Sequence, residues 1–499
     1  MVTPFSFEVF LHTGDTGVIR LLAHYAGYDR DLGGSLVDGE EEVGRQLGEA
    51  TSRHPSRFLR LLTAHWADIS ARFRDDILDG IADYLAYRHG RLKPNDAWTP
   101  LEEPDAPVLA NQILDELERH PAHWRRNRPA AAALKACAHV IREPQDAEWL
   151  VSLAEGFVDL GEESTIHGDS VNLVSVGMNM MGGKIVGALM TLANNFAERG
   201  MALPELLPPT LRRFTRHEHP AIRALMLWRL PYLQSKNPAL GWELFHRAME
   251  QNAAGLWKYA ESCLYYAYHD HFERVAPWLE RIRCEGNKED RETWGRISAL
   301  AALSGRIGLT GLLGELTALD IAGAWQGAAS VWTNAGNIGQ HREPCLAGIE
   351  AGLKAGSHHA AAVARQMENI FRDSAPPVSI PIDLIRRCFG VIENDSDSEE
   401  KHHRLFGFDE WLSAISQRDP DLALAAAKIY LAYVKRTKPG LYDYKDRLVQ
   451  MITRLFTEAE EREESDHGAM LKRVVAAQDS LLSLGVNSID DWPKAAERQ

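Results

Sequence analysis

Two short clusters of histidine and acidic side chains have the residue types that could bind a metal ion or move a proton. They are His217, Glu218 and His219, and His269, Asp270 and His271. Ligands on a helix share a face only when they lie three or four residues apart, whereas residues two apart point in different directions. The spacing of each histidine pair therefore argues against a metal site. We predict polar residues at helix ends, and neither a metal nor any other cofactor.

The segment nearest to a phosphate-binding loop is GMNMMGGK, from Gly177 to Lys184. A nucleotide-binding loop requires glycine where Met178 stands and a hydroxyl side chain where Ile185 follows the lysine. No strand pattern precedes this segment, and we find no GxSxG elbow or Cys-His arrangement that supplies a nucleophile with a base. We therefore predict that the chain is not an enzyme. A hydrolase site near Tyr265 to His271 is the least favoured alternative.

The balance of charge argues against a nucleic-acid partner. The chain has 499 residues and a net charge of -15, from 70 acidic and 55 basic residues. Such a chain repels a phosphate backbone unless a basic block reverses the charge locally. The densest basic runs, at 125–128 and 435–438, lie beside prolines near expected helix ends, where solvated or helix-terminal charges are usual.

The cysteines and the apolar segments bear on the compartment. The five cysteines form no CxxC pair, and their odd number precludes complete pairing within the chain; they are Cys137, Cys263, Cys284, Cys345 and Cys388. We find no signal-peptide pattern near the N-terminus and no apolar run of the ~18 residues that a membrane span needs. These features predict a cytoplasmic protein without membrane attachment.

Amphipathic segments alternate with short breaks of Pro, Gly, Asp or Asn from about residue 55 onward, which is typical of helix-turn-helix units. Between Ser70 and His89, apolar side chains trace one helical face, and Gly90 is placed to end that helix. Pro55 suits the first turn of the helix before it. A single apolar stripe is buried only when neighbouring helix pairs stack. The sequence therefore predicts an all-α fold, an α-solenoid of stacked antiparallel helix pairs similar to HEAT and TPR repeats, with roughly 22 to 26 helices.

We expect three regions along the chain. Residues 1–160 form N-terminal helical repeats, residues 161–392 form central HEAT-like repeats, and residues 404–499 form a C-terminal helical cap. The segment between the last two, 393–403, reads ENDSDSEEKHH and has no apolar residue. This composition predicts a mobile acidic loop.

The tryptophan-rich stretch 325–337 is our candidate for a partner contact. Trp325 and Trp332 are seven residues apart and so share a helical face. Asn334 and Asn337, with flanking glycines, predict a loop at a concave edge. Aromatic residues at this spacing belong to the core more often than to an interface, so core packing is the alternative role. We predict that these four residues bind a protein partner.

Three stretches resemble the C-terminal sensor region of bacterial STAND NTPases, the signal-transduction ATPases of antiphage defence. In the first, the family has an Asn-x-x-Arg-Gly element that opens a small-residue helix. Here the matching residues are Asn179, Met180, Met181, Gly182 and Gly183, so a glycine stands in place of the arginine.

The second stretch is His219 to Leu233 together with residues 272–279, and the segment Pro204 to Leu233 looks like a HEAT repeat. In that repeat a proline opens the second helix, and the following aliphatic residue and arginine, here Ile222 and Arg223, face the core and the neighbouring unit. We expect this second helix to end near Pro231. The third stretch is 405–432, which looks like the family's late Trp-Leu helix followed by a helix opened by Asp-Pro.

This resemblance implies a non-catalytic recognition module. In the family, the full-length relative carries an N-terminal effector, a central ATPase that oligomerises, and this helical region as the part that binds a viral protein. The partner expected for this chain is therefore a protein, such as a phage structural or packaging protein, with an ATPase and effector upstream or on a separate subunit. The alternative, from a different class, is a structural scaffold or adaptor that binds host partners.

Overall fold

The computed structural model describes residues 5–27, 39–90, 92–95, 97–158, 172–250, 255–372, 376–394, 405–437 and 446–485. Within these ranges the fold is all-α, as predicted, because they contain helices and turns and no strand. The chain divides into two compact units, residues 1–266 (unit 1) and 267–499 (unit 2). The division falls inside the expected central region 161–392, and each unit is described by itself.

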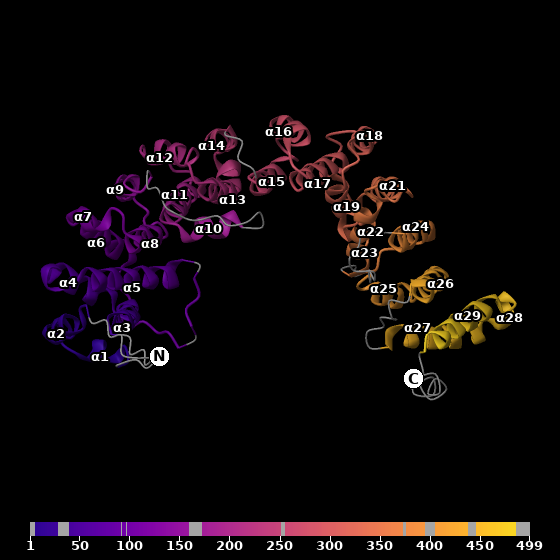
Figure 1. The fold of residues 1–499 in the computed structure, drawn as a ribbon, viewed down its shortest axis with the longest axis horizontal. Helices are drawn as coiled ribbons and strands as arrows, with labels where there is room; N and C mark the ends of the chain where they lie inside the picture. Colours follow the sequence, from indigo (N-terminus) through magenta and orange to yellow (C-terminus); the bar gives the residue numbers. More distant parts are fainter. Residues whose placement is uncertain are drawn as a thin grey trace. The chain divides into compact units, whose positions relative to one another are not determined.

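Unit 1 contains the first fifteen helices and one 3-10 turn (Figure 1). They are α1 (Glu8–His12), α2 (Asp15–Tyr25), α3 (Glu40–Arg53), α4 (Pro55–Ala64), η1 (Trp66–Asp68), α5 (Ala71–His89), α6 (Ala106–Arg119), α7 (Pro121–Trp124), α8 (Arg128–Cys137), α9 (Pro144–Glu155), α10 (Leu173–Asn179), α11 (Met181–Glu198), α12 (Leu207–Phe214), α13 (Pro220–Lys236), α14 (Pro238–Glu250) and α15 (Trp257–Ala267).

Unit 2 contains the helices numbered from α16 onward. They are α16 (Phe272–Glu285), α17 (Asp290–Leu303), α18 (Leu309–Leu319), α19 (Ala322–Trp332), α20 (Ala335–Gln340), α21 (Arg342–Gly352), α22 (Ala360–Gln366), α23 (Glu368–Arg372), α24 (Ile382–Glu393), α25 (Phe408–Ile415), α26 (Pro420–Thr437), α27 (Arg447–Glu461), α28 (Glu463–Asp466) and α29 (Ala469–Ser483).

The numbering in the described residues runs to α29, beyond the 22 to 26 helices expected. Very short helices such as α7, α23 and α28 account for the excess. Each of them lies directly beside a longer helix and adds only one turn, which a periodicity of apolar residues does not separate from its neighbour.

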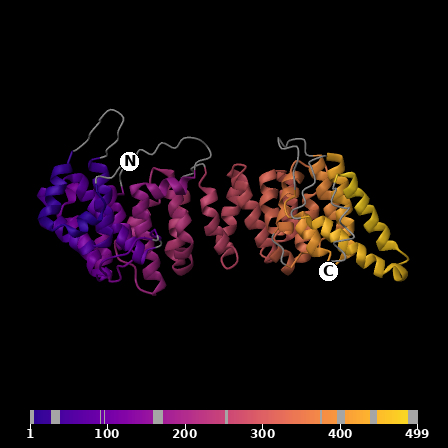
Figure 2. The ribbon, with the colours of Figure 1, turned by 90° about the horizontal axis from the view of Figure 1, so that it is seen from below.

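The helices of unit 1 form two rows. In one, called the α5 row, α3, α5, α8, α11 and α13 contact one another in that order. In the other, called the α4 row, α4, α6, α9, α12 and α14 do the same. Contacts such as α4 with α5, α6 with α8 and α13 with α14 join the rows, and Figure 2 shows the helices of this part of the chain side by side.

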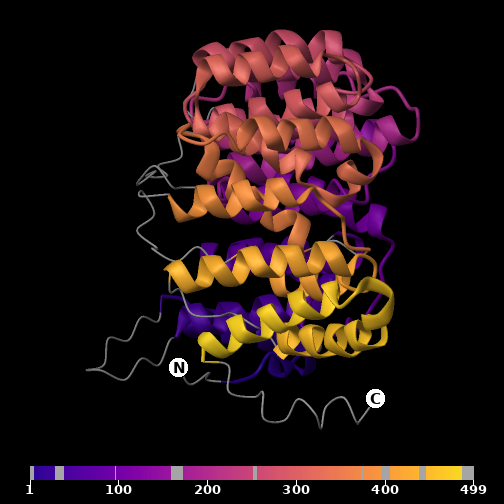
Figure 3. The same ribbon diagram turned by 90° about the vertical axis from the view of Figure 1, so that its right-hand side faces the viewer.

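Unit 2 also brings helices together in chain order. Helices α17, α19, α22, α24, α26 and α29 contact one another in sequence, and α23, α25 and α27 form a further row. The orange-to-yellow helices are stacked in this way in Figure 3. The core of each unit lies between its rows, where tryptophans such as Trp124, Trp294 and Trp411 are buried.

Helix boundaries in unit 1 follow the signals read from the sequence. The side chain of Ser70 accepts a hydrogen bond from the amide of Phe73 and so begins α5, and Gly90 ends that helix, as predicted. Pro55 occupies the first turn of α4, also as predicted.

Helix α13 corrects one expected boundary, because it continues through Pro231 to Lys236 instead of ending near that proline. Proline has no amide hydrogen, so the carbonyl of Leu227, four residues earlier, loses its partner within the helix. The thiol of Cys263 on α15 lies 3.4 Å from that carbonyl oxygen and donates to it. A neighbouring helix thus satisfies the group that the proline leaves open.

Both boundaries expected between regions lie largely outside the described residues. Residues 159–171 and 395–404 are not described, and these ranges include the expected boundary at 160 and most of the acidic loop 393–403. Glu393 is described and belongs to α24, where it accepts two hydrogen bonds from Arg436 of α26 at 2.7 and 2.8 Å. The three-region division itself stays a prediction.

No single helix in the described ranges is long and apolar enough to cross a membrane. Helices α10 and α11 meet the length and composition only when taken together, and they are bent by 92° at their junction. Most residues of α11 are buried inside unit 1, which is the usual environment of such a helix in a core.

Candidate binding site

Four aspartates on α5 line a polar cavity in unit 1. Asp75, Asp76, Asp79 and Asp83 lie at positions i, i+1, i+4 and i+8, so they share one side of the helix. The cavity has a volume of about 550 Å³, and its other lining residues are Arg72 on α5, Arg128, Pro129 and Ala132 on α8, and Lys184 on α11. The α5 row therefore places acidic and basic side chains around one opening.

Asp75 fixes the position of α8 against α5. Its Oδ1 atom lies 2.8 Å from Nε2 of His123 and accepts a hydrogen bond of 2.8 Å from the side-chain amide of Asn127. The Asn127 side chain in turn accepts a bond from the amide of Ala130 and begins α8. This aspartate is therefore occupied in holding the cavity wall.

Asp76 lies deeper, at the contact between α3 and α5. Its carboxylate occupies the space that a side chain at Gly44 would fill, so glycine is needed there on α3. Arg72 Nε lies 3.5 Å from Oδ2, and this buried oxygen accepts no hydrogen bond from any described residue. Burial, the main cause, raises the pKa of Asp76 to about 7. Its charged form is thus held at a cost in free energy.

Asp79 and Asp83 stand at the mouth of the cavity, where their side chains reach solvent. The surrounding protein still desolvates them and raises the pKa of both, that of Asp83 to about 6. Lys184 of α11 opposes this shift through its positive charge, without forming a close ion pair with either carboxylate. Burial and the nearby Arg128 lower the pKa of Lys184.

Two further cations lie beside this cavity, over α11. Lys135 of α8 and Arg229 of α13 both approach Gly187, whose missing side chain leaves room for them. A methyl group at Gly187 would lie 3.5 Å from Cε of Lys135 and 3.9 Å from Cζ of Arg229. Burial first, then the charges of Arg229 and Lys184, lower the pKa of Lys135.

Exposed aromatic rings continue the row on α13. Trp228 and Tyr232 are 46% and 39% exposed and lie one helical turn apart. The guanidinium of Arg229 lies 5.7 Å from the centre of the Trp228 ring, and the ammonium of Lys236 lies 5.7 Å from that of Tyr232. The α5 row thus runs from carboxylates on α5, through cations on α8 and α11, to aromatic rings and cations on α13.

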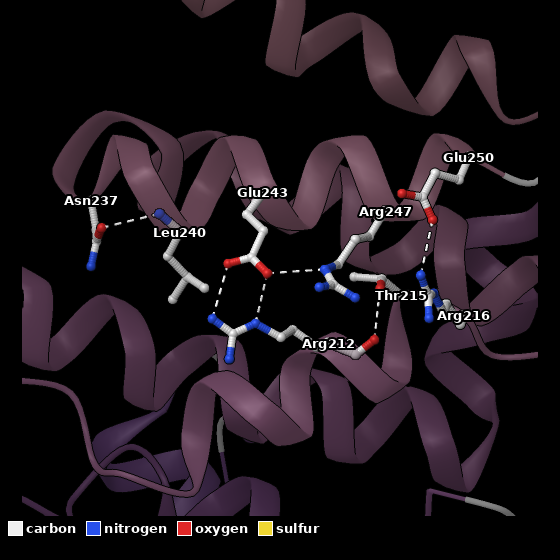
Figure 4. Close-up of polar contacts among 8 residues, drawn as sticks. All are labelled: Arg212, Thr215, Arg216, Asn237, Leu240, Glu243, Arg247 and Glu250. Atoms are coloured by element: carbon white, nitrogen blue, oxygen red, sulfur yellow. Dashed lines mark hydrogen bonds and ion pairs between the residues drawn. The ribbon is translucent and has the colours of Figure 1, made fainter.

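The α4 row carries several charges that are matched by close partners. Arg212 of α12 donates two hydrogen bonds, of 2.7 and 2.9 Å, to the two carboxylate oxygens of Glu243 on α14 (Figure 4). Arg247 donates a third at 3.0 Å, and Arg216 bonds Glu250 at 3.2 Å. These pairs tie α12 to α14, whereas most of the charges around the cavity lack such partners.

The residues that match the family-like element lie where α10, α11 and α13 meet. Asn179 ends α10, and its side-chain amide donates to the carbonyl of Ser175 at 3.0 Å. Gly183 packs against the carbonyl of Gly177 and against Leu225 of α13, so a methyl group there would overlap backbone atoms. Gly182 and Arg223 are buried. A packing role suits Gly183, which lies close to backbone atoms next to the 92° bend between α10 and α11.

The segment from Gly177 to Lys184 spans this bend. It is the end of one helix and the beginning of the next, and no strand precedes it in the described residues. The geometry of a phosphate loop, which requires a strand, a glycine-rich loop and a helix, is therefore not formed here. The side chain of Lys184 instead lines the cavity with the α5 carboxylates.

The structure corrects the expectation for the tryptophan-rich stretch. Trp325 and Trp332 have no exposed surface, and Trp325 stacks on His359 at 4.2 Å while its indole donates to the carbonyl of Leu316 at 3.0 Å. A partner cannot reach either ring, so both are core residues, which is the more common role for their spacing.

The two asparagines of that stretch lie at the short helix α20 and not in a loop. Asn334 is the N-cap of α20, and Asn337 lies within the helix. The Asn334 side chain accepts a bond from the amide of Asn337 at 3.1 Å, and the Asn337 side chain donates to the carbonyl of Val331 at 2.9 Å. Asn334 is exposed. Its contact with a partner stays a prediction.

The histidine clusters behave as helix-end residues. His219 begins α13, because its Nδ1 accepts a bond from the amide of Ala221 at 3.2 Å, as predicted. His269 and Asp270 form an exposed pair, 2.8 Å apart, between α15 and α16, and the hydrogen bond from His269 lowers the pKa of Asp270. No group of three metal-binding side chains occurs within the described ranges.

The sequence contains one signal for the cavity. The aspartates at 75, 79 and 83 repeat with the helical period of α5, on a different face from its apolar residues. An acidic stripe of this kind is usually solvated, so the pattern alone does not distinguish it from a site. Lys135, Lys184 and Arg229 come from three helices, and only the packing of α8, α11 and α13 brings them together.

Comparisons with known proteins give this chain no relative: no protein-family model, curated protein or solved structure matches it.

Proposed function

We propose that this chain is an α-solenoid of stacked antiparallel helix pairs whose exposed row binds a folded protein without chemical catalysis. The order of contacts supports this architecture, because in each unit successive helices of a row touch one another. Such arrays expose long continuous surfaces made from the same side of successive helices. The α5 row is the surface we assign to binding.

The charged cavity of that row is the observation that carries the proposal. Its carboxylates and cations remain incompletely paired, and burial disfavours the charged forms of Asp76, Asp79, Asp83 and Lys184. Charges kept in this way destabilise the free protein and gain partners when a complementary surface covers them. The exposed rings of Trp228 and Tyr232 supply residue types that contribute strongly to binding energy.

We further propose that the partner is a viral protein, such as a phage structural or packaging protein. The resemblance to the sensor region of STAND NTPases supports this step, and it implies an ATPase and effector elsewhere. Free cysteines suit a reducing cytoplasm: Cys137, Cys263, Cys345 and Cys388 are buried and none is in a disulfide.

Affinity capture tests the function. The purified chain is exposed to lysates of phage-infected and uninfected cells, in parallel with a variant carrying Asp79→Asn and Asp83→Asn. Asp383→Asn on α24, an exposed carboxylate, serves as the control for a lost charge.

We expect a phage protein to be retained only from infected lysate, by the wild type and by the control, and about tenfold less by the double variant. The same host protein retained from both lysates would instead favour a scaffold. Equal retention by all three forms would show that the cavity is not the binding surface.

A further inference from the structure

Lys135 and Arg229 bring two positive charges together over Gly187 in unit 1. They approach each other over Gly187 from α8 and α13, two helices that α11 separates. Lys135 makes no hydrogen bond or ion pair with any residue in the described ranges, and its pKa is lowered by burial and by the two neighbouring cations. Like charges repel each other in a partly buried place, so the neighbouring Arg229 disfavours the charged form of Lys135.

The surroundings of this pair indicate what kind of anion would relieve the repulsion. The carboxylates of Asp79 and Asp83 lie in the same row, near Lys184, and they would repel a polyanion such as a phosphate backbone. A polypeptide can alternate its charges, so an acidic residue can meet Lys135 and Arg229 while a basic residue meets the α5 carboxylates. Trp228, next to Arg229, adds an exposed ring for apolar contact.

We propose that Lys135, Arg229 and Trp228 form a subsite for the carboxylate of an aspartate or glutamate in a protein partner, and that the α5 carboxylates bind a basic residue of the same segment. This inference rests on the proposed function, since it specifies the chemistry of the bound protein. Neighbouring helices of a row lie roughly 8–10 Å apart, so about three to six residues of extended chain would separate the two charges.

A peptide-binding measurement on the full chain tests the subsite. The probe is a fluorescein-labelled peptide with a glutamate block at one end and a lysine block at the other, and its binding is followed by anisotropy at low and high salt. The comparison peptides are one of the same composition in scrambled order, one of glutamate alone and one of lysine alone. A single-stranded oligonucleotide is the phosphate-bearing comparison.

We expect the block peptide to bind more tightly than the scrambled one and to be weakened about tenfold by Lys135→Met or by Arg229→Met. Lys135→Met should also raise the melting temperature of the free chain, because it removes the repulsion. Arg216→Met, which removes the same charge from the α4 row, should leave peptide binding unchanged.

Three results would overturn the inference. The wild type could fail to distinguish the block peptide from the scrambled one. Lys135→Met could destabilise the chain and leave binding intact, which would make Lys135 a structural residue. The oligonucleotide could bind more tightly than any peptide and lose affinity in Lys135→Met. Capture of a phage protein is unaffected by the first two results, so failure of the subsite and failure of the proposed function are distinguishable.

Discussion

Gly187 on α11 in unit 1 and the glycines of α19 in unit 2 serve opposite purposes. On α19, Gly323 and Gly327 face the carbonyls of Lys288 and Glu292, and Gly295 on α17 faces the carbonyl of Ala324, so these two helices touch backbone to backbone. On α11, Gly187 is covered by the side chains of Lys135 and Arg229. The absence of a side chain therefore brings helices together at Gly327 and leaves room for charged groups at Gly187.

Replacing one glycine of each kind by alanine is the most direct test of this difference. Gly327→Ala places a methyl group against the carbonyl of Glu292, so α17 and α19 must separate, and we expect a loss of about 3 kcal/mol of stability. A methyl group at Gly187 would make only ordinary van der Waals contacts. We therefore expect Gly187→Ala to raise the stability by about 0.5–1 kcal/mol, through the higher helix propensity of alanine. Urea-denaturation midpoints measure both.

Equal losses in the two variants would mean that Gly187 is also a packing residue. Gly314→Ala on α18, where a methyl group would meet no neighbouring atom within 4 Å, controls for helix propensity alone. It should stabilise unit 2 slightly.

Two buried acidic side chains, one in each unit, differ in how they are hydrogen-bonded. Asp290 at the start of α17 is buried, but its side chain accepts a hydrogen bond from the amide of Asn287 at 3.0 Å. Asp76 on α5 has a buried oxygen without such a bond, next to Arg72 at 3.5 Å. In unit 2 the backbone thus satisfies the carboxylate of Asp290, whereas in unit 1 a buried oxygen of Asp76 stays without a hydrogen bond beside the cavity.

Asp76→Asn should therefore stabilise unit 1, and only at high pH. The pKa of Asp76 rises from 3.8 to about 7 in the folded state, so the folded chain binds the proton more tightly than the unfolded chain does. The penalty is absent below the unfolded value, grows between pH 4 and 7, and is complete above pH 7. At pH 8 we expect a gain of about 2 kcal/mol, because Arg72 and solvent screen part of the charge.

Denaturation midpoints at pH 4.5 and pH 8 check this sign. The midpoint of Asp76→Asn should exceed that of the wild type at pH 8 and approach it at pH 4.5. The midpoint of Asp383→Asn should show no such dependence on pH. A gain that is equal at both pH values would trace the effect to packing against Gly44 instead of to the charge.

Local signals predicted much of the fold and little of the site. His219, Pro55 and Gly90 lie at helix ends as expected, because capping depends on residues next to each other in sequence. The buried rings of Trp325 and Trp332 show the limit of periodicity, since a face shared by two aromatic residues can point to solvent or to the core.

The pair formed by Lys135 and Arg229 could not be predicted from residues that are close in sequence. Lys135 and Arg229 meet only because α8, α11 and α13 pack in order and because Gly187 leaves space between them. Helix α13 continues past Pro231 for a similar reason, since Cys263 on another helix supplies the missing hydrogen bond. Tertiary contacts decided both features.

The α4 row offers the smallest of these effects and separates structural charge from binding charge. Glu243→Gln weakens the bidentate pair with Arg212 and the bond from Arg247, and we expect a loss of about 0.5–1 kcal/mol because the pair is one-third exposed. The hydrogen bonds from Arg212 hold the pKa of Glu243 below its usual value of 4.5, so this contribution is present above that pH and is lost as the pH falls through the lowered pKa. The variant should therefore differ from the wild type in its denaturation midpoint at pH 7 and converge with it in acid. Binding of the block peptide to Glu243→Gln should be unchanged, since Glu243 belongs to the α4 row, whose charges tie α12 to α14, and not to the α5 row. A weakened affinity in Glu243→Gln would instead show that the charges of the two rows act together, and the distinction between them would have to be given up.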